Sequence, residues 1–170
     1  MQKLFLLVLL GSFLSCGDDK ETSTLNVEFK LTYGGTPLTM FTNYTYPSGE
    51  VFYFSRFSFF TSDIKLKNSS GTYIDILDTK YNNLTNTHTG TGNSYNFDID
   101  DIKNGNYTSI KFGLGVPPSA NAKTPADYDS DHPLSNQSEY WGGWLSYIFT
   151  RTEGNIDFDA LIGKHATLTI

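Results

Sequence analysis

Apolar and polar residues alternate with a period of two in several short stretches of the chain. Such alternation is typical of β-strands with one buried face, because successive side chains of a strand point to opposite sides. Stretches with this pattern, or with a high density of aromatic and β-branched residues, predict strands at 25–31, 51–60, 64–67, 72–76, 95–99, 107–114, 145–150 and 166–170.

The predicted strand at 51–60 is the richest in aromatic residues. Both of its faces are largely apolar, and one of them carries Arg56, so we expect it in the centre of a sheet. The stretches 64–67 and 72–76 flank a turn of Asn, Ser and Gly, which predicts a hairpin. The segment 79–92 is rich in Asn and Thr and lacks periodicity, so we expect a loop there.

Gly, Asn and Pro lie between the predicted strands, and no stretch has the period of a convincing amphipathic helix. This arrangement predicts an all-β fold, an antiparallel β-sandwich of Greek-key or immunoglobulin-like type with long loops. The longest loop is expected over 115–144, where Pro, Asp, Ser and Gly show no apolar period. Loops of this length in compact domains usually carry function.

The N-terminus has the features of an export signal. Lys3 precedes an apolar run at 4–14, which is too short to span a bilayer by itself. The run ends in Leu-Ser-Cys at 14–16, which resembles the lipobox of bacterial lipoproteins. We therefore expect cleavage before Cys16 and a lipid anchor on its thiol and new amine, which would hold the protein on a membrane.

These features divide the chain into a signal peptide at 1–15, an acidic tether at 16–24 and a β domain at 25–170. The acidic residues of the tether resemble the surface-export signal of Bacteroidetes lipoproteins, with a simple solvated linker as the alternative. We expect an outer-membrane lipoprotein that faces the periplasm or the cell surface. The chain ends on an alternating apolar stretch, which predicts either a terminal strand or a fragment of a longer protein.

Composition supports a single folded domain. Hydrophobic residues make up 38% of the chain, aromatic residues 15% and charged residues only 18%, which is unlike a disordered chain. The formal net charge of −6 argues against nucleic acid as a partner, because binding to phosphates needs a basic patch. Cys16 is the only cysteine, so no disulfide can form within the chain.

Motifs of common catalytic sites are absent from the sequence. The three histidines, His88, His132 and His165, lie in no HExxH motif, and the chain has no GxSxG elbow, no phosphate-binding glycine loop and no paired cysteines. We therefore do not expect an enzyme.

Trp141 and Trp144 are separated by two glycines in the long loop. One interpretation is that both indoles plug one end of the sandwich core. The other is a surface platform that these indoles form with Tyr140 and Tyr128 and that binds a glycan or a protein without metal.

Segments spread over most of the expected domain share a further resemblance. They are FSFFTSDI, FDI, FGLGVPP, DHPL, YW, YIF and EG, at 57–64, 97–99, 112–118, 131–134, 140–141, 147–149 and 153–154. In this order they resemble the MbnP-like family of exported copper-binding proteins, which is related to MopE and is described with methanobactin systems.

The resemblance implies that copper is bound through histidine beside an oxidisable tryptophan. It implies His132 as a metal ligand, His165 as a second one, and Trp141 as the neighbouring indole. A dihaem peroxidase-like redox partner is also implied. The second tryptophan of the family's pattern falls at Gly143 here, and Trp144 follows one position later.

Overall fold

The computed structural model describes residues 21–90, 92–159 and 164–169, with side chains as far as residue 157. The predicted signal peptide, Cys16 and most of the tether lie outside the described residues. The strands are β1 (Thr22–Phe29), β2 (Thr32–Tyr33), β3 (Thr36–Pro37), β4 (Tyr44–Thr45), β5 (Val51–Asn68), β6 (Tyr73–Asn83), β7 (Tyr95–Lys103), β8 (Tyr107–Leu114), β9 (Tyr140–Trp141), β10 (Ser146–Tyr147), β11 (Thr150–Asp159) and β12 (Lys164–Thr169). Short helical elements are α1 (Pro118–Asn121) and the 3₁₀ turns η1 (Thr85–Thr87), η2 (Pro125–Asp127), η3 (Pro133–Ser135) and η4 (Gln137–Glu139).

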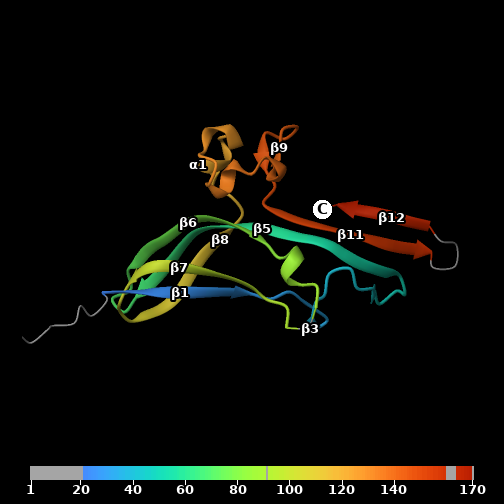
Figure 1. The fold of residues 1–170 in the computed structure, drawn as a ribbon, viewed down its shortest axis with the longest axis horizontal. Coiled ribbons are helices and arrows are strands. Elements are labelled where there is room, and N and C mark those ends of the chain that lie inside the picture. Colours follow the sequence, from blue (N-terminus) through green and yellow to red (C-terminus); the bar gives the residue numbers. More distant parts are fainter. Residues whose placement is uncertain (1–20, 91, 160–163, 170) are drawn as a thin grey trace, which may run out of the picture.

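Strand β5 is the spine of the main sheet and runs along most of the molecule (Figure 1). Its first half pairs with β11, and its second half pairs with β8 on that same edge. The opposite edge is occupied by β4 and β6, while β12 pairs with the outer edge of β11. All of these pairings are antiparallel, which confirms the predicted central position of the aromatic stretch.

A second, smaller sheet of β1 and β7 covers the second half of β5 and makes the fold an antiparallel β-sandwich (Figure 1). Side chains from both layers meet in a buried cluster of Ile64, Leu66, Phe97, Ile99 and Ile102. Burial of each such side chain contributes about 1.5–3 kcal/mol to folding. The period of two in the sequence explains this core, because alternate residues of the facing strands point inward.

The stretches 51–60 and 64–67 form one strand rather than two. The polar residues between them indicated a break, but the backbone passes through Asp63 with a positive φ of 49°. The register of β5 against both β6 and β8 shifts at this point, so a bulge absorbs the irregularity and the strand continues.

The prediction of a loop over 79–92 was wrong for its first part, because β6 continues to Asn83. The Asn82 side chain is buried there and donates hydrogen bonds to the carbonyl of Phe59 and to the hydroxyl of Thr61. The sheet thus satisfies the nitrogen of this amide, whereas Oδ1 is buried with no hydrogen-bond partner among the described residues, so a polar side chain occupies an interior strand position with one acceptor unpaired.

The prediction of one strand over 145–150 was also wrong. Only Ser146–Tyr147 is extended, as β10, and the long strand β11 begins at Thr150. Leu145 has a positive φ of 51°, which ends any extended run before β10. None of the helices in the described part of the chain is long and apolar enough to cross a membrane.

Candidate functional site

The expected long loop is confirmed as an excursion from the main sheet over 115–149. Both of its ends are tied to one residue of β5: Gly115 N donates to the carbonyl oxygen of Phe60 at 2.8 Å, and Phe60 N donates to that of Phe149 at 3.0 Å. A buried cluster of Phe60, Val116, Leu134 and Tyr147 fixes the excursion to the sheet. Figure 1 shows it as a lobe, with α1 and β9, on one face of the sheet.

His132 lies at the start of η3 within this excursion and is half-buried. Its ring stacks on Tyr128 with the centroids 4.4 Å apart. Together with Pro133 it lines a pocket of about 500 Å³ whose other wall is β6, from Asp75 to Thr79. Asp75 and Asp78 belong to that wall, so the pocket beside the imidazole is lined in part by acidic residues.

The hydrogen bond of His132 sets its tautomer. Nδ1 accepts from the backbone N–H of Leu134 at 3.1 Å, so this nitrogen carries no proton and the neutral ring carries its proton on Nε2. A metal can bind Nε2 only after that proton has left. Nδ1 then either takes up a proton and gives up the hydrogen bond from Leu134, or stays unprotonated in an imidazolate ring. Metal binding at this ring would therefore compete with the turn that the ring caps.

His88 is completely buried at 0% exposure, and both of its ring nitrogens are engaged. Nε2 accepts from Leu31 N at 3.2 Å, so Nδ1 carries the proton and donates to the carbonyl of Leu84 at 3.1 Å. Burial lowers the pKa of His88, and the hydrogen bond to Leu84 opposes this in part. The ring is a neutral structural bridge between the segments before β2 and after β6.

The backbone of His165 pairs with Asp157, which pairs with Val51 at the first residue of β5. The pocket of His132 includes Leu77, which pairs with Ile64, 13 residues further along β5. At about 3.3 Å per residue these positions are roughly 40 Å apart along the strand. The side chain of His165 is outside the described residues, and its backbone position does not bring it to His132 within one chain.

Trp141 and Trp144 form an exposed stack at the tip of the β9–β10 hairpin. Trp144 N donates to the carbonyl of Trp141 at 3.1 Å and closes the turn, while the ring centroids lie 4.2 Å apart. Their exposed fractions are 50% and 70%, so the interpretation of the indoles as a plug of the core was wrong. A Cβ at Gly143 would lie 2.9 Å from Trp141 Nε1, which explains why a residue without a side chain stands there.

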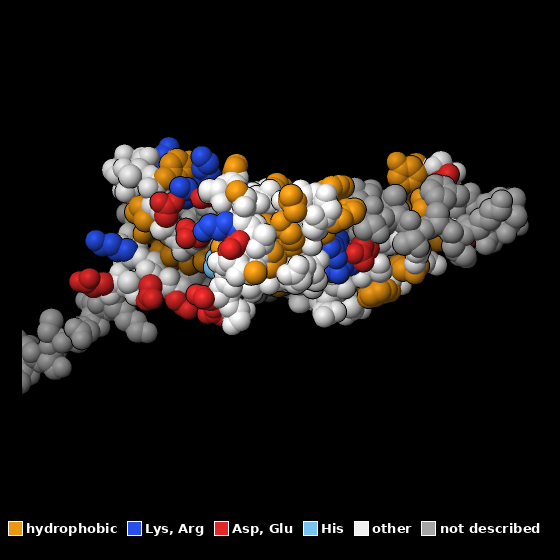
Figure 2. Space-filling view, turned by 90° about the horizontal axis from the view of Figure 1, so that it is seen from above, with side chains coloured by type: hydrophobic (Ala, Val, Ile, Leu, Met, Phe, Trp, Pro, Cys, Tyr) orange, Lys and Arg blue, Asp and Glu red, His pale blue; other side chains and the backbone are white. Residues whose placement is uncertain are grey.

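The stack borders a groove of about 930 Å³. Its other walls include Tyr140, Phe149, and the charged side chains of Arg151 and Glu153. Figure 2, seen from the side on which the excursion lies, shows hydrophobic side chains exposed among polar ones. This groove shares no lining residue with the pocket of His132, so the structure places the motif-matched imidazole and the indoles at separate sites.

A buried charge network holds the base of the hairpin. Glu139, at 1% exposure, forms ion pairs with Arg56 and, at 3.5 Å, with Arg151, and it accepts a hydrogen bond from the Tyr81 hydroxyl at 2.7 Å. Glu153 lies 3.9 Å from Arg56 and 3.6 Å from Arg151. Sequence reasoning missed this network; Arg56 within an aromatic strand was its one visible signal.

Tyr147 connects the hairpin to the turn of His132. Its hydroxyl donates to the carbonyl of Leu134 at 2.7 Å, and burial raises its pKa to about 12. The side chain of Asn121 accepts from Tyr147 N at 2.8 Å, which joins α1 to β10. The excursion is therefore one packed unit, with the His132 pocket and the indole groove as separate surfaces of it.

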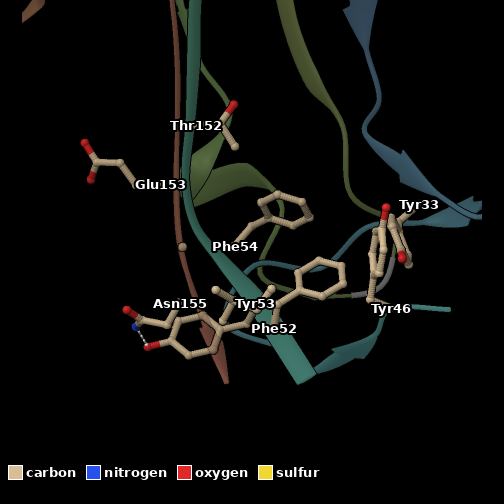
Figure 3. Close-up of a pocket in the computed structure, with 10 residues that line it drawn as sticks. Tyr33, Tyr46, Phe52, Tyr53, Phe54, Thr152, Glu153 and Asn155 are labelled. Atoms are coloured by element: carbon tan, nitrogen blue, oxygen red, sulfur yellow. Dashed lines mark hydrogen bonds between the residues drawn. The ribbon is translucent and has the colours of Figure 1, made fainter. Parts of the chain in front are cut away.

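A third pocket, of about 270 Å³, lies over the first half of β5 (Figure 3). Rings of Tyr33, Tyr46 and Phe52 form much of its wall, and Asn155 donates a hydrogen bond to the hydroxyl of Tyr53 beside it. A Cβ at Gly154 would lie 2.2 Å from the carbonyl oxygen of Tyr53, so only glycine fits this wall. No imidazole among the described side chains lines this pocket.

The all-β sandwich with its excursion from the central strand belongs to a known class of proteins. The family model MbnP matches residues 22–165, and the chain therefore belongs to the MbnP family. Among solved structures, MbnP from Methylosinus trichosporium has the same fold, with a TM-score of 0.63 and 14% sequence identity. The match covers 88% of this chain and 61% of that one, and no curated protein matches.

The MbnP family is associated with copper, so the relevant question is which side chains of this chain have donor atoms free for this metal. Within the part of the chain that the structure describes, no three His, Cys, Asp or Glu side chains gather as a metal site. His88 has no ring nitrogen to offer, whereas His132 presents its ring to a pocket with carboxylates. The described residues thus fit one imidazole contact to copper and do not form a complete multi-histidine site.

Proposed function

We propose that this chain is an exported, lipid-anchored protein of the MbnP family that binds copper at His132. The observation that supports the assignment is the contrast between the two described imidazoles. His88 is buried with both nitrogens bonded to the backbone, whereas His132 lines an open pocket and uses only Nδ1. Imidazole is a good ligand for copper in either oxidation state.

The surroundings of His132 favour Cu(II) over Cu(I). Asp75 and Asp78 line the same pocket but do not gather with His132 as a preformed site; if their carboxylates move to join the imidazole, the mixed nitrogen and oxygen donor set would suit Cu(II), whereas Cu(I) prefers thiolates and thioethers. Asp75 also pairs with Lys65 at 2.6 Å, so it must exchange this partner to serve a metal. Tyr128 stacks on the imidazole and limits the orientations of the ring.

The remaining elements of the proposal concern location and partners. Cys16 carries the lipid anchor and holds the domain at the outer membrane. A dihaem peroxidase-like redox partner would have access to Trp141, which is half-exposed at the tip of the excursion. Because Trp141 lines a different groove from His132, we do not include this indole in the copper contact.

The test is a calorimetric titration of Cu(II) into the purified protein and into His132→Ala and His165→Ala variants. We expect His132→Ala to abolish the tightest binding event and His165→Ala to leave its stoichiometry and affinity unchanged. If His132→Ala binds copper as the parent does, or if only His165→Ala loses the metal, the assignment to His132 is wrong.

A further inference from the structure

We propose that the groove beside the Trp141–Trp144 stack binds a neutral hexopyranose glycan. This inference goes beyond copper binding, because the groove and the pocket of His132 share no residue. The volume of about 930 Å³ lies near the upper end of the range of about 300–1,000 Å³ that small-molecule sites occupy.

The apolar part of the groove is flat and accessible. The two indoles stack at an angle of 25° and cover one face of each other, while their exposed fractions of 50% and 70% leave the outer surface of the pair accessible to solvent. Each aromatic ring of this size offers about 150–250 Å² of surface, and it loses little conformational freedom when a ligand covers it. The apolar face of a pyranose ring, with its row of C–H groups, matches such a flat surface.

The polar part of the groove is electrically balanced. Arg151 and Glu153 both line it, and they face each other at 3.6 Å. Ser146 and Thr150 add hydroxyl groups to the wall. A neutral ligand with many hydroxyls can use this donor and acceptor pair, whereas an anion or a cation would meet one repulsive partner.

The groove is held in shape before any ligand arrives. Glu139 anchors the hairpin through Arg56 and Arg151, and Arg151 also donates to the carbonyl of Ser138 at 2.8 Å. The bare Cα of Gly143 lets the Trp141 indole fold back onto Trp144. Preorganisation of this kind lowers the entropic cost of binding, which matters for a weakly interacting ligand such as a sugar.

A lipid surface suits this groove less well. Leu145 lies beside Trp144 and is 73% exposed, so the tip of the hairpin is apolar. The ion pair of Arg151 and Glu153 lines the same groove as the indoles, however, and a chain of net charge −6 is repelled by anionic headgroups. Membrane insertion is therefore the competing outcome of the experiment and not the proposal.

The chain offers a built-in reporter, because Trp141 and Trp144 are its only tryptophans. The purified protein is titrated with neutral hexasaccharides of β-1,4-glucose, α-1,4-glucose, β-1,4-mannose and β-1,4-N-acetylglucosamine, at up to millimolar concentrations. We expect at least one of them to change tryptophan emission saturably and to show a matching heat in calorimetry.

Variants distinguish stacking from general surface effects. Trp144→Ala should weaken the binding of that hexasaccharide about tenfold or more, and Trp144→Tyr should restore part of the affinity. Tyr46→Ala is the matched control, because it removes an aromatic ring that is also exposed, at 53% against 70% for Trp144, but that lines the pocket over β5 instead. This control should bind as the parent does.

Three results would overturn the proposal. The first is that none of the four hexasaccharides binds. The second is that binding survives Trp144→Ala unchanged but is lost in Tyr46→Ala. The third is that phosphatidylcholine vesicles shift the emission while the sugars do not, which would identify the hairpin tip as a membrane contact.

Discussion

Glu139 is the residue on which the excursion depends most strongly. It is buried, and it neutralises Arg56 and Arg151 while Tyr81 donates a further hydrogen bond to it. Removal of one partner from a buried ion pair is costly, because the remaining charges stay in a poorly solvated site. At the level of single residues, this carboxylate joins the excursion to strands β5 and β11.

We predict that Glu139→Gln lowers the free energy of unfolding by about 3 kcal/mol, at the low end for buried pairs since both arginines keep some solvent contact and still face Glu153. Urea denaturation measures the change. Glu28→Gln is the control, because its ion pair with Lys30 is exposed and contributes little. Equal stability of the two variants would contradict this role.

His88 gives the fold a dependence on pH. Its pKa is lowered by burial, so the unfolded chain, with an ordinary pKa near 6.5, binds a proton more readily than the folded protein. The stability that the neutral ring contributes is therefore present above pH 6.5 and is lost as the pH falls toward the lowered pKa of the folded state.

We predict that the free energy of unfolding falls as the pH is lowered below 6.5, and that His88→Gln removes this part of the dependence. The variant will also be less stable at pH 7, because Leu31 N and the Leu84 carbonyl lose an ideal bridge. The parent protein and His88→Gln are compared by the slope of the free energy of unfolding against pH, and not by its value at one pH. A parent protein whose stability is flat through this range would contradict the account.

At the scale of elements, the indole stack on the β9–β10 hairpin depends on one of two adjacent glycines, Gly143, and not on Gly142. A Cβ at Gly143 would meet Trp141 Nε1 at 2.9 Å, whereas a Cβ at Gly142 would meet nothing within 4 Å. The contact at Gly143 is with a side chain and not with the backbone, so the indole can move away without unfolding the hairpin.

We predict that Gly143→Ala disrupts the indole stack while Gly142→Ala preserves it. Near-ultraviolet circular dichroism detects the stack through the coupling of the two indoles, and it should decrease in Gly143→Ala alone. Thermal unfolding should be nearly the same in both variants. If Gly142→Ala reduces the signal equally, the packing at Gly143 is not what orients Trp141.

Strands could be predicted where a period of two marks a buried face, as in β1 and β7. The prediction of strand ends failed where one residue changes the backbone conformation, or where a polar side chain is buried and hydrogen-bonded within the sheet. Asp63 bulges inside β5 instead of ending it, and Asn82 lies buried in β6 with its amide nitrogen bonded to Phe59 and Thr61. Such outcomes depend on partner strands far away in sequence, which a local pattern does not contain.

The candidate site was predictable in part. The aromatic motif and the His-Pro-Leu motif indicated the excursion. The exposure of both indoles and the place of Tyr140 in their groove agree with the platform interpretation, whereas its fourth ring, Tyr128, stacks on His132 instead. The separation of His132 from Trp141 could not be predicted, because it results from packing against different strands. Glu139 and Arg56 lie 83 positions apart, so their ion pair leaves no local pattern.

At the scale of the whole molecule, β5 organises both surfaces. Its second half pairs with β6, which forms one wall of the His132 pocket, and its first half pairs with β11, which lines the indole groove. The excursion leaves and rejoins the sheet at Phe60, between these halves. A single long strand therefore places the His132 pocket and the aromatic groove at separate positions on the same unit.

The most direct test of this account is nuclear magnetic resonance during a titration with substoichiometric Cu(II). Paramagnetic copper broadens the signals of nuclei close to it, and the protein has only two indole N–H signals, from Trp141 and Trp144. We predict that signals of His132, Leu134 and the facing residues of β6 are lost first, while both indole signals persist. Early loss of the indole signals with those of His132 intact would contradict the account.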